Sequence, residues 1–207
     1  MTAPAREFAE AYVPEDRIIQ VARSVAVEVG LVAIQPGAGA ALRLLAAACG
    51  ARAVVEIGTG TGVSGLWLLR GMRPEGILTT IDLEAEHHRM ARRIFLEAGY
   101  QPSRTRLITG RALDVLPRLS DGAYDLIFID GDREEHAAGV TAALRLLRPG
   151  GVMVVSGALA GGRIADPAAR DPQTVVLREL VRSLRDAEEW LPALLPVGDG
   201  LLAAVKR

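Results

Sequence analysis

The chain has 207 residues, half of them hydrophobic, and a formal net charge of −1 at pH 7. This length suits one domain with an ordinary core, so we expect a single domain over residues 1–207 that includes a helical segment over 1–50. The basic residues form no cluster dense enough to follow a nucleic-acid backbone, and we expect no nucleic-acid partner.

Cys49 is the only cysteine, which excludes an intrachain disulfide. The N-terminal residues contain no apolar signal core, and no later stretch is apolar over enough residues to cross a bilayer. We therefore expect a cytoplasmic protein with no membrane partner.

The first fifty residues predict three helices, over 6–12, 16–29 and 40–49. Pro14 separates the first two, and Glu15 and Asp16 suit the start of the second. The segment 31–39, which joins the second helix to the third, is rich in turn-forming residues.

From residue 52 onwards, strand and helix patterns alternate. Strands are predicted over 53–57, 77–82, 105–109, 124–130 and 151–156, with helices over 64–72, 85–98, 111–119 and 134–147. This alternation predicts a parallel sheet with helices on both faces. After a loop at 157–172 and a helix over 172–188, apolar runs at 193–196 and 201–205 flank an Asp-Gly turn and predict an antiparallel hairpin. The fold class is therefore α/β, with a mostly parallel sheet, N-terminal helices and a C-terminal hairpin.

The run from Val54 to Ser64, VVEIGTGTGVS, places three glycines at alternate positions after a β-branched segment. We interpret it as a strand, a tight turn and a helix that Ser64 can cap. The glycines leave room for a ligand to press against peptide N–H groups at the helix N-terminus. Glycine-rich turns also occur without a ligand, so this motif alone is weak evidence.

Asp82 ends the next predicted strand and can accept hydrogen bonds from both hydroxyls of an adenosine ribose, in NAD or in S-adenosylmethionine. The third glycine of the motif comes one residue too early for the G-x-G-x-x-G pattern of a dinucleotide site. Glu56 disfavours a pyrophosphate and suits a ligand that carries an ammonium and a sulfonium. The pattern favours S-adenosylmethionine, and an NAD-dependent oxidoreductase is the weaker alternative.

These residues resemble the S-adenosylmethionine-dependent O-methyltransferases of the catechol and caffeoyl-coenzyme A type, from about Leu31 to the C-terminus. The resemblance is carried by IQP at 34–36 with Gly39, VEIGTGTGVS at 55–64, TID at 80–82, TGRA at 109–112, DLIFID at 125–130, GRIADP at 162–167 and LPVGDGL at 195–201. It implies the class I methyltransferase fold, Rossmann-like with a seven-stranded sheet. It also implies a small-molecule acceptor, S-adenosylhomocysteine as product, and a homodimer in which the N-terminal helices could pack across a two-fold axis.

The resemblance further implies where the cofactor lies. In the family, a serine at the place of Ser64 holds the methionine carboxylate, the strand end at Asp82 holds the ribose, and the turn over 109–112 holds the adenine. The expected cofactor-binding residues are Ile34, Glu56, Gly58, Thr59, Gly60, Ser64, Asp82, Leu83, Gly110, Arg111, Ala112 and Asp130.

The chain departs from the family at the metal site. The family usually binds Mg²⁺ with an aspartate at the place of Asp130 and an Asp-Asn pair where this chain has Ser156 and Gly157. The metal would align two substrate oxygens and favour the phenolate. Because a hard cation needs several oxygen ligands, we expect no divalent metal here; a shifted site completed by Asp132 or Glu134 is the alternative.

The second departure concerns the base. Arg133 stands where the family often has a lysine that takes the substrate's proton, but arginine stays protonated and cannot be a general base. Lys206, the only lysine, lies too close to the C-terminus for this role.

The candidate catalytic residues are therefore Asp130, Arg133 and His136, with Asp132 as a further possible base. His136 suits a base because its unperturbed pKa lies near neutrality, although a surface histidine is the alternative. Arg133 could stabilise an oxyanion. We expect His87 and His88 to face solvent.

The leading hypothesis is an enzyme that methylates an oxygen of a small aromatic or other hydroxylated acceptor without the family's metal. The loop over 157–172, with Gly157, Gly161 and Gly162 as hinges, would form part of the acceptor wall. The alternative is a protein that binds S-adenosylmethionine or S-adenosylhomocysteine without turnover, as a sensor or a dimer partner.

Overall fold

The computed structural model describes residues 2–207. Within this range no helix has both the length and the apolar character needed to cross a membrane. The helices are α1 (Ala3–Ala11), α2 (Arg17–Glu28), α3 (Pro36–Ala48), α4 (Val63–Gly71), α5 (Ala85–Glu97), α6 (Ala112–Val115), α7 (His136–Leu146) and α8 (Pro172–Asp186). The strands are β1 (Ala53–Ile57), β2 (Ile77–Asp82), β3 (Thr105–Thr109), β4 (Tyr124–Ile129), β5 (Leu147–Val155), β6 (Trp190–Leu195) and β7 (Leu201–Lys206). Four short 3₁₀ helices are η1 (Pro102–Arg104), η2 (Leu116–Arg118), η3 (Arg133–Glu135) and η4 (Ala160–Ala165).

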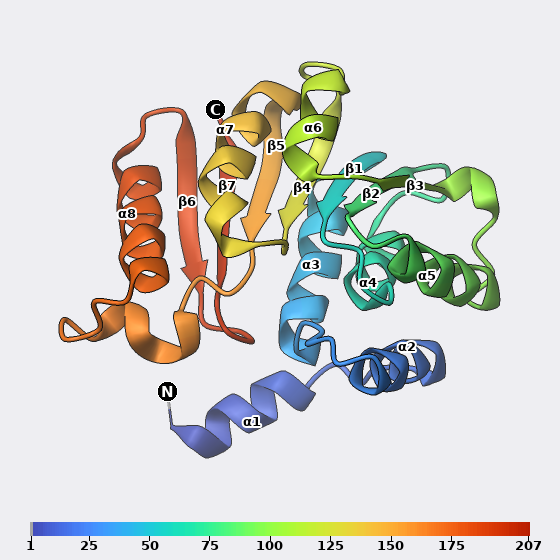
Figure 1. Cartoon of the computed structure of the whole chain (residues 1–207), viewed down its shortest axis with the longest axis horizontal. Coiled ribbons are helices and arrows are strands. Elements are labelled where there is room, and N and C mark those ends of the chain that lie inside the picture. The colour runs from blue at the N-terminus through green and yellow to red at the C-terminus, as the bar shows by residue number, and fades with distance from the viewer. Residues whose placement is uncertain (1) are drawn as a thin grey trace.

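The strands form one seven-stranded sheet in the order β3-β2-β1-β4-β5-β7-β6 (Figure 1). Strands β1 to β5 pair in parallel, and β7 lies antiparallel between β5 and β6. The predicted parallel sheet and C-terminal hairpin are confirmed. Because β1 pairs with both β2 and β4, the strand order reverses there, and ligands of such sheets bind at the carboxyl ends beside this reversal.

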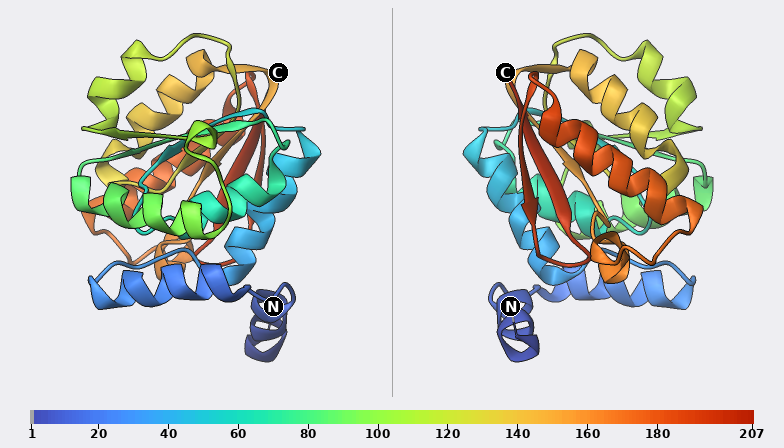
Figure 2. Two further views of the ribbon diagram at one scale, coloured as in Figure 1. Left: turned by 90° about the vertical axis from the view of Figure 1, so that its right-hand side faces the viewer. Right: turned by 90° about the vertical axis from the view of Figure 1, so that its left-hand side faces the viewer.

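Helices cover both faces of the sheet (Figures 1 and 2). Helices α3, α4 and α5 pack on one face, where Leu42, Leu66 and Phe95 meet strand residues such as Val54. Helices α6, α7 and α8 pack on the other face, which holds the alternate strand residues, such as Val55. Each fully buried aliphatic or aromatic side chain contributes about 1.5–3 kcal/mol to stability. The two layers of helices therefore stabilise the sheet, and with it the positions of the strand ends.

The helices α1 and α2 lie outside these layers, at one end of the molecule (Figure 2). As predicted, Asp16 caps α2, and its side chain accepts hydrogen bonds from two backbone N–H groups of the first turn. Helix α1 is held through Glu10, whose carboxylate accepts hydrogen bonds from the N–H groups of Gly37 (2.8 Å) and Gly198 (2.5 Å). Glu10 thus ties α1 both to the start of α3 and to the turn between β6 and β7.

Several element boundaries differ from the prediction. Helix α3 begins at Pro36 rather than residue 40, because proline is well suited to the first helical position. The predicted helix over 111–119 is the four-residue α6 followed by η2, and β5 begins at Leu147 directly after α7. Ser64 does not cap α4: the cap is Gly62, in the left-handed conformation at φ 89°, without a side-chain hydrogen bond.

Candidate functional site

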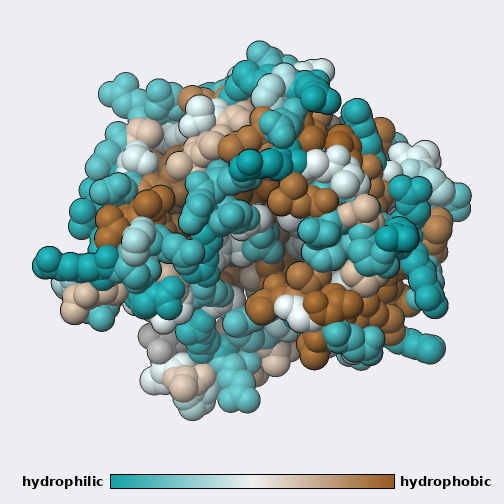
Figure 3. Space-filling model, in the orientation of Figure 1, coloured by the Kyte–Doolittle hydropathy of each residue, from teal (hydrophilic) through white to brown (hydrophobic). Residues whose placement is uncertain are grey.

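A cavity of about 520 Å³ lies at the carboxyl ends of β1, β2 and β4. The face of the molecule in Figure 3 is hollowed near its centre, with hydrophobic surface along part of the rim. The cavity wall contains all of the expected cofactor-binding residues except Glu56: Ile34, Gly58, Thr59, Gly60, Ser64, Asp82, Leu83, Gly110, Arg111, Ala112 and Asp130. The structure therefore brings together residues that lie far apart in the sequence.

The glycine turn is required by the fold itself. Gly58 has φ 93°, and a Cβ there would lie 3.0 Å from the carbonyl oxygen of Asp130. Gly62 has φ 89°, and a Cβ there would lie 2.9 Å from the ring of Phe95. Both backbone conformations favour glycine. The backbone conformation requires these two glycines whether or not a ligand binds. The evidence for a cofactor site is therefore the cavity, not the glycines.

Asp82 holds this turn in place. Its Oδ2 accepts hydrogen bonds from the N–H groups of Thr59 (2.9 Å) and Gly60 (3.0 Å), and its Oδ1 accepts them from Glu84 N–H (3.0 Å) and His87 Nδ1 (3.0 Å). Burial acts to raise the pKa of Asp82, but these hydrogen bonds outweigh it and hold the pKa below its usual value. The carboxylate is therefore charged, and its lone pairs are largely in use, because a carboxylate accepts about four hydrogen bonds. A ribose would have to share these positions or displace His87.

The prediction that His87 and His88 face solvent is wrong. His87 lies in the cavity wall and donates to Asp82. His88 is only 5% exposed; its Nε2 lies 3.1 Å from the hydroxyl oxygen of Thr59 and its Nδ1 lies 2.9 Å from that of Thr109. Both histidines lie on α5. The helical periodicity of the sequence could not show that they contact polar groups of Asp82, Thr59 and Thr109, because those residues belong to other elements.

Glu56 lies beneath the cavity rather than in its wall, with no exposed surface. Burial raises the pKa of Glu56 to about 8, although the Ser64 hydroxyl and then the Thr80 hydroxyl, which donates a hydrogen bond to Oε2 (2.6 Å), oppose the shift. Thr80 in turn lies 2.6 Å from the Thr59 hydroxyl, so a buried chain of hydrogen bonds runs from Glu56 to His88. The Oε1 atom of Glu56 has no hydrogen-bond partner among residues 2–207. In this arrangement Glu56 has no direct contact with the cavity.

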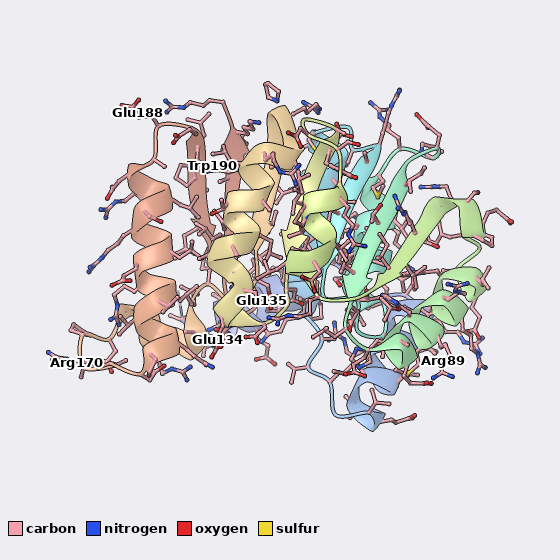
Figure 4. All side chains as sticks on the ribbon, turned by 45° about the horizontal axis from the view of Figure 1, so that its top comes forward. Arg89, Glu134, Glu135, Arg170, Glu188 and Trp190 are labelled. Carbon is pink, nitrogen blue, oxygen red and sulfur yellow. The ribbon has the colours of Figure 1, made fainter. Side chains whose placement is uncertain are left out.

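Arg111 and Glu135 form an ion pair in the cavity wall, with 2.6 Å between Nη2 and Oε1. Figure 4 shows Glu135 beside Glu134, just before α7. The side chain of Arg111 is 61% exposed, and exposed pairs contribute only about 0–1 kcal/mol. Glu135 was not among the residues predicted from the sequence, because its partner lies 24 residues away in the chain.

A second cavity of about 260 Å³ adjoins the first. The residues that line both are Val32, Ala33, Ile34, Asp130 and Gly131. The rest of the smaller cavity is polar on one side, where its wall includes Arg133, His136, Ser156, Gly157 and Asp199. All three candidate catalytic residues therefore meet here, and Asp130 borders both cavities. Asp199 was not predicted as a site residue; its place in the turn LPVGDGL was the only signal.

Asp130 is half-buried, and the partial desolvation of its carboxyl group raises its pKa to about 6. The Ser156 hydroxyl and the charge of Arg133 oppose the shift. Asp130 is therefore mainly ionised at neutral pH, and its charge borders the place where the two cavities meet.

His136 is buried, with 3% of its surface exposed, so the alternative of a surface histidine does not hold. Its Nε2 lies 3.2 Å from the carbonyl oxygen of Gly131. A carbonyl oxygen only accepts hydrogen bonds, so Nε2 carries the hydrogen and Nδ1 carries a lone pair. In the described part of the chain, this buried Nδ1 has no hydrogen-bond partner. Burial also lowers the pKa of His136, which keeps the ring neutral.

The residues present do not fit the family's metal. Among residues 2–207, no group of three or more His, Cys, Asp or Glu side chains could hold a metal ion. Asp132 and Glu134 are exposed: Asp132 lines the larger cavity but not the smaller one, Glu134 lines neither, and the Asp132 carboxylate accepts a hydrogen bond from Glu134 N–H. Neither carboxylate joins Asp130 in a group of metal ligands among residues 2–207. Lys206 donates to the carbonyl oxygens of Leu144 and Leu147 and lines neither cavity.

Comparisons with known proteins agree with this architecture. The sequence profile of a family described as O-methyltransferase matches residues 11–207. The probable O-methyltransferase of Mycobacterium tuberculosis strain H37Rv is 54% identical over 198 residues, which cover 96% of this chain and 88% of the relative.

Two solved structures share the fold along their length. A protein from Corynebacterium glutamicum superposes with a TM-score of 0.90 at 37% identity, covering 98% of this chain and 95% of the other. The O-methyltransferase TomG from Streptomyces achromogenes, involved in tomaymycin synthesis and solved in complex with S-adenosylmethionine, has a TM-score of 0.87 at 30% identity, covering 100% of this chain and 99% of TomG. The chain therefore belongs to the O-methyltransferase family and has the fold of the class I S-adenosylmethionine-dependent methyltransferases.

Proposed function

We propose that this protein transfers a methyl group from S-adenosylmethionine to the hydroxyl oxygen of a small phenolic acceptor, without the divalent metal of its family. The observation that carries the proposal is the meeting of two cavities at Asp130 and Gly131. A donor in the larger cavity and an acceptor in the smaller one would lie end to end. Such an arrangement would bring the acceptor oxygen close to the methyl group, and proximity of this kind provides much of the rate acceleration.

The larger cavity suits the cofactor in size and in chemistry. Its volume of about 520 Å³ is typical of small-molecule sites. Asp82 would face the ribose, and Ser64, in the first turn of α4, would lie beside the methionine carboxylate. The complex of the related TomG with S-adenosylmethionine supports this assignment.

The chain's residues prepare the acceptor. S-adenosylmethionine supplies the methyl group, and its sulfur keeps the electron pair of the S–C bond that breaks as the acceptor oxygen forms the new O–C bond. His136 accepts the hydroxyl proton at Nδ1, because the Gly131 carbonyl holds its other nitrogen as the donor. The negative charge of Asp132 favours the imidazolium that results, whereas the positive charge of Arg133 opposes it.

A protein that binds the cofactor without turnover is the second candidate. It is favoured by the same three changes from the family pattern, at Arg133, Ser156 and Gly157. Both candidates need the larger cavity, so cofactor binding does not distinguish them. Only the enzyme would transfer a methyl group.

We also propose that the protein is a homodimer. Of the residues in α1, none is buried, and Phe8 and Tyr12 are 73% and 74% exposed. A second copy could cover these rings. Light scattering of the purified protein should give twice the monomer mass of 22.0 kDa, and a monomer at micromolar concentration would contradict the proposal.

The experiment that tests the function is titration calorimetry with S-adenosylmethionine and S-adenosylhomocysteine, in chelator and in Mg²⁺, followed by transfer of a labelled methyl group to phenols. We expect equal affinities in both buffers, and labelled ether in chelator. Binding or transfer that needs Mg²⁺ would contradict metal independence. Binding without transfer to any phenol would favour the second candidate.

A further inference from the structure

The end of β5, where the family has metal ligands, is covered by a guanidinium in this chain. Gly157 has φ 67°, and a Cβ there would lie 3.2 Å from Nη2 and 3.6 Å from Nε of Arg133. A side chain at this position would crowd the guanidinium in its present place. Gly157 thus both removes a metal ligand and admits the arginine.

Asp199 holds Arg133 in this position. Nη2 of Arg133 lies 3.3 Å from Oδ2 of Asp199, and the other carboxylate oxygen accepts a hydrogen bond from Gly161 N–H at 2.6 Å. The backbone carbonyl of Asp199 also accepts one from Leu159 N–H at 2.8 Å. The Asp199 carboxylate is therefore hydrogen-bonded to the loop after β5, and it orients the Arg133 side chain.

The guanidinium keeps donors for a ligand. Arginine has five N–H groups, and the hydrogen bond to Asp199 uses one of them. The Arg133 side chain is 34% exposed and lines the smaller cavity. Among the described residues in that wall, Arg133 is the one permanently cationic side chain, and His136, whose buried Nδ1 has no hydrogen-bond partner, belongs to the same wall. The side chains of a histidine with an unpaired ring nitrogen and of a permanently charged arginine therefore line one small cavity.

We propose that Arg133, positioned by Asp199 and admitted by Gly157, binds the nucleophilic oxygen of the acceptor in place of a metal ion, and that the preferred acceptors are phenols with a single hydroxyl. The inference rests on the proposed O-methylation. A metal ion aligns two substrate oxygens, whereas a guanidinium N–H can bind a single substrate oxygen. An acceptor with one hydroxyl is therefore sufficient. The hydroxyl proton moves to His136 Nδ1, Arg133 donates to the phenolate oxygen, and this oxygen forms the bond to the methyl carbon as the S–C bond breaks with its electron pair on sulfur.

The first test needs no turnover. Wild type saturated with S-adenosylhomocysteine is titrated with 4-nitrophenol, whose anion is detected by its absorbance, at a series of pH values in chelator. We expect the pKa of bound 4-nitrophenol to be at least about one unit lower on wild type than on R133Q, since one unit is a tenfold change. D199N should lose part of this shift.

The matched control is R89Q. Arg89 is an exposed residue on α5 that pairs with Glu86, and Figure 4 shows it on the other side of the view from Glu134. R89Q should behave as wild type. Equal pKa values of bound 4-nitrophenol on wild type and R133Q would overturn the assignment of Arg133.

The second test measures transfer in chelator, with phenol and catechol as a matched pair. We expect kcat/KM of wild type for phenol to equal or exceed that for catechol, after correction for the two hydroxyls of catechol. R133A should lose about a hundredfold in kcat, the size of one oxyanion-binding group. Added guanidinium ion should restore part of the loss in R133A but not in H136N, and the affinity for S-adenosylmethionine should stay unchanged because Arg133 does not line the larger cavity.

The two tests separate the inference from the proposed function. A strong preference for catechol, or full activity of R133A, would overturn the inference while leaving the O-methyltransferase proposal intact. A wild type that lowers the pKa of 4-nitrophenol but transfers no methyl group would support the oxyanion site and overturn the proposed reaction.

Discussion

The Nε2 atom of His136 lies 3.2 Å from the carbonyl oxygen of Gly131, and this hydrogen bond decides which nitrogen of the ring can accept a proton. Gly131 follows the aspartate at the end of β4, and His136 is the first residue of α7. The connection between strand and helix therefore sets the tautomer of the proposed base.

His136→Asn should lower kcat by about 10²–10⁴-fold, the usual contribution of a general base, with little effect on the affinity for S-adenosylmethionine. In wild type, activity should fall as the pH drops through the pKa of His136, because the protonated ring cannot accept a proton. Burial and the charge of Arg133 lower this pKa, while Asp132 and the Gly131 carbonyl oppose them, so the fall should begin below the usual value of about 6.5.

The pH profile also tests the assignment of His136 against Asp130, whose pKa is about 6. The residual activity of H136N should no longer fall as the pH drops, so the acidic limb of the pH profile should disappear. A limb that persists in H136N and disappears in D130N would identify Asp130 as the group that must be deprotonated.

Glu56→Gln should change how stability depends on pH. The pKa of Glu56 is about 8 in the folded protein and about 4.5 when unfolded, so the folded state binds the proton more tightly between these values. Stability of the ligand-free protein should therefore fall as pH rises from about 5 to 8, by about 1.4 kcal/mol per unit of pKa difference at most. Urea unfolding at several pH values measures this slope. E56Q should remove most of it, and an unchanged slope would show that Glu56 is not protonated in the fold.

Asp82→Ala should weaken S-adenosylmethionine binding by about 1.5–3 kcal/mol, because charge-assisted hydrogen bonds are lost. It should also lower Tm, since Asp82 holds the N–H groups of Thr59 and Gly60. His87→Ala is the control, as it removes one donor from Asp82 but leaves the turn. Calorimetry should show that H87A binds the cofactor at least as tightly as wild type; a loss as large as that of D82A would mean that His87 itself contacts the ligand.

Ser156→Asp with Gly157→Asn should not create a metal site by itself. Asparagine tolerates the left-handed conformation of residue 157, but its Cβ would lie 3.2 Å from the Arg133 guanidinium. Adding Arg133→Ala removes both the obstruction and the positive charge. We expect Mg²⁺ or Mn²⁺ binding by calorimetry only in the triple variant; binding by the double variant would show that Arg133 readily leaves its place over residue 157.

Local sequence patterns were enough to predict the order of strands and helices along the chain and the edge of the sheet where the larger cavity lies. Hydrophobic periodicity is a local property, and it identified β1 to β4 and the hairpin that ends the chain. Parallel strands bring their carboxyl ends to one edge, so the pattern alone predicted that Gly58, Asp82, Gly110 and Asp130 would share one wall.

The packing of helices and turns on the sheet determines which side chains pair and which are buried. Arg133 and Asp199 are 66 residues apart in the chain, and Arg111 and Glu135 are 24 apart. No local pattern relates such residues, because their distance depends on how distant elements meet in three dimensions. The same packing buries Glu56, His88 and His136, which are residue types usually found at the surface. Glu56 and His88 thereby become the two ends of a hydrogen-bonded chain beneath the larger cavity, and His136 becomes a candidate base in the smaller one.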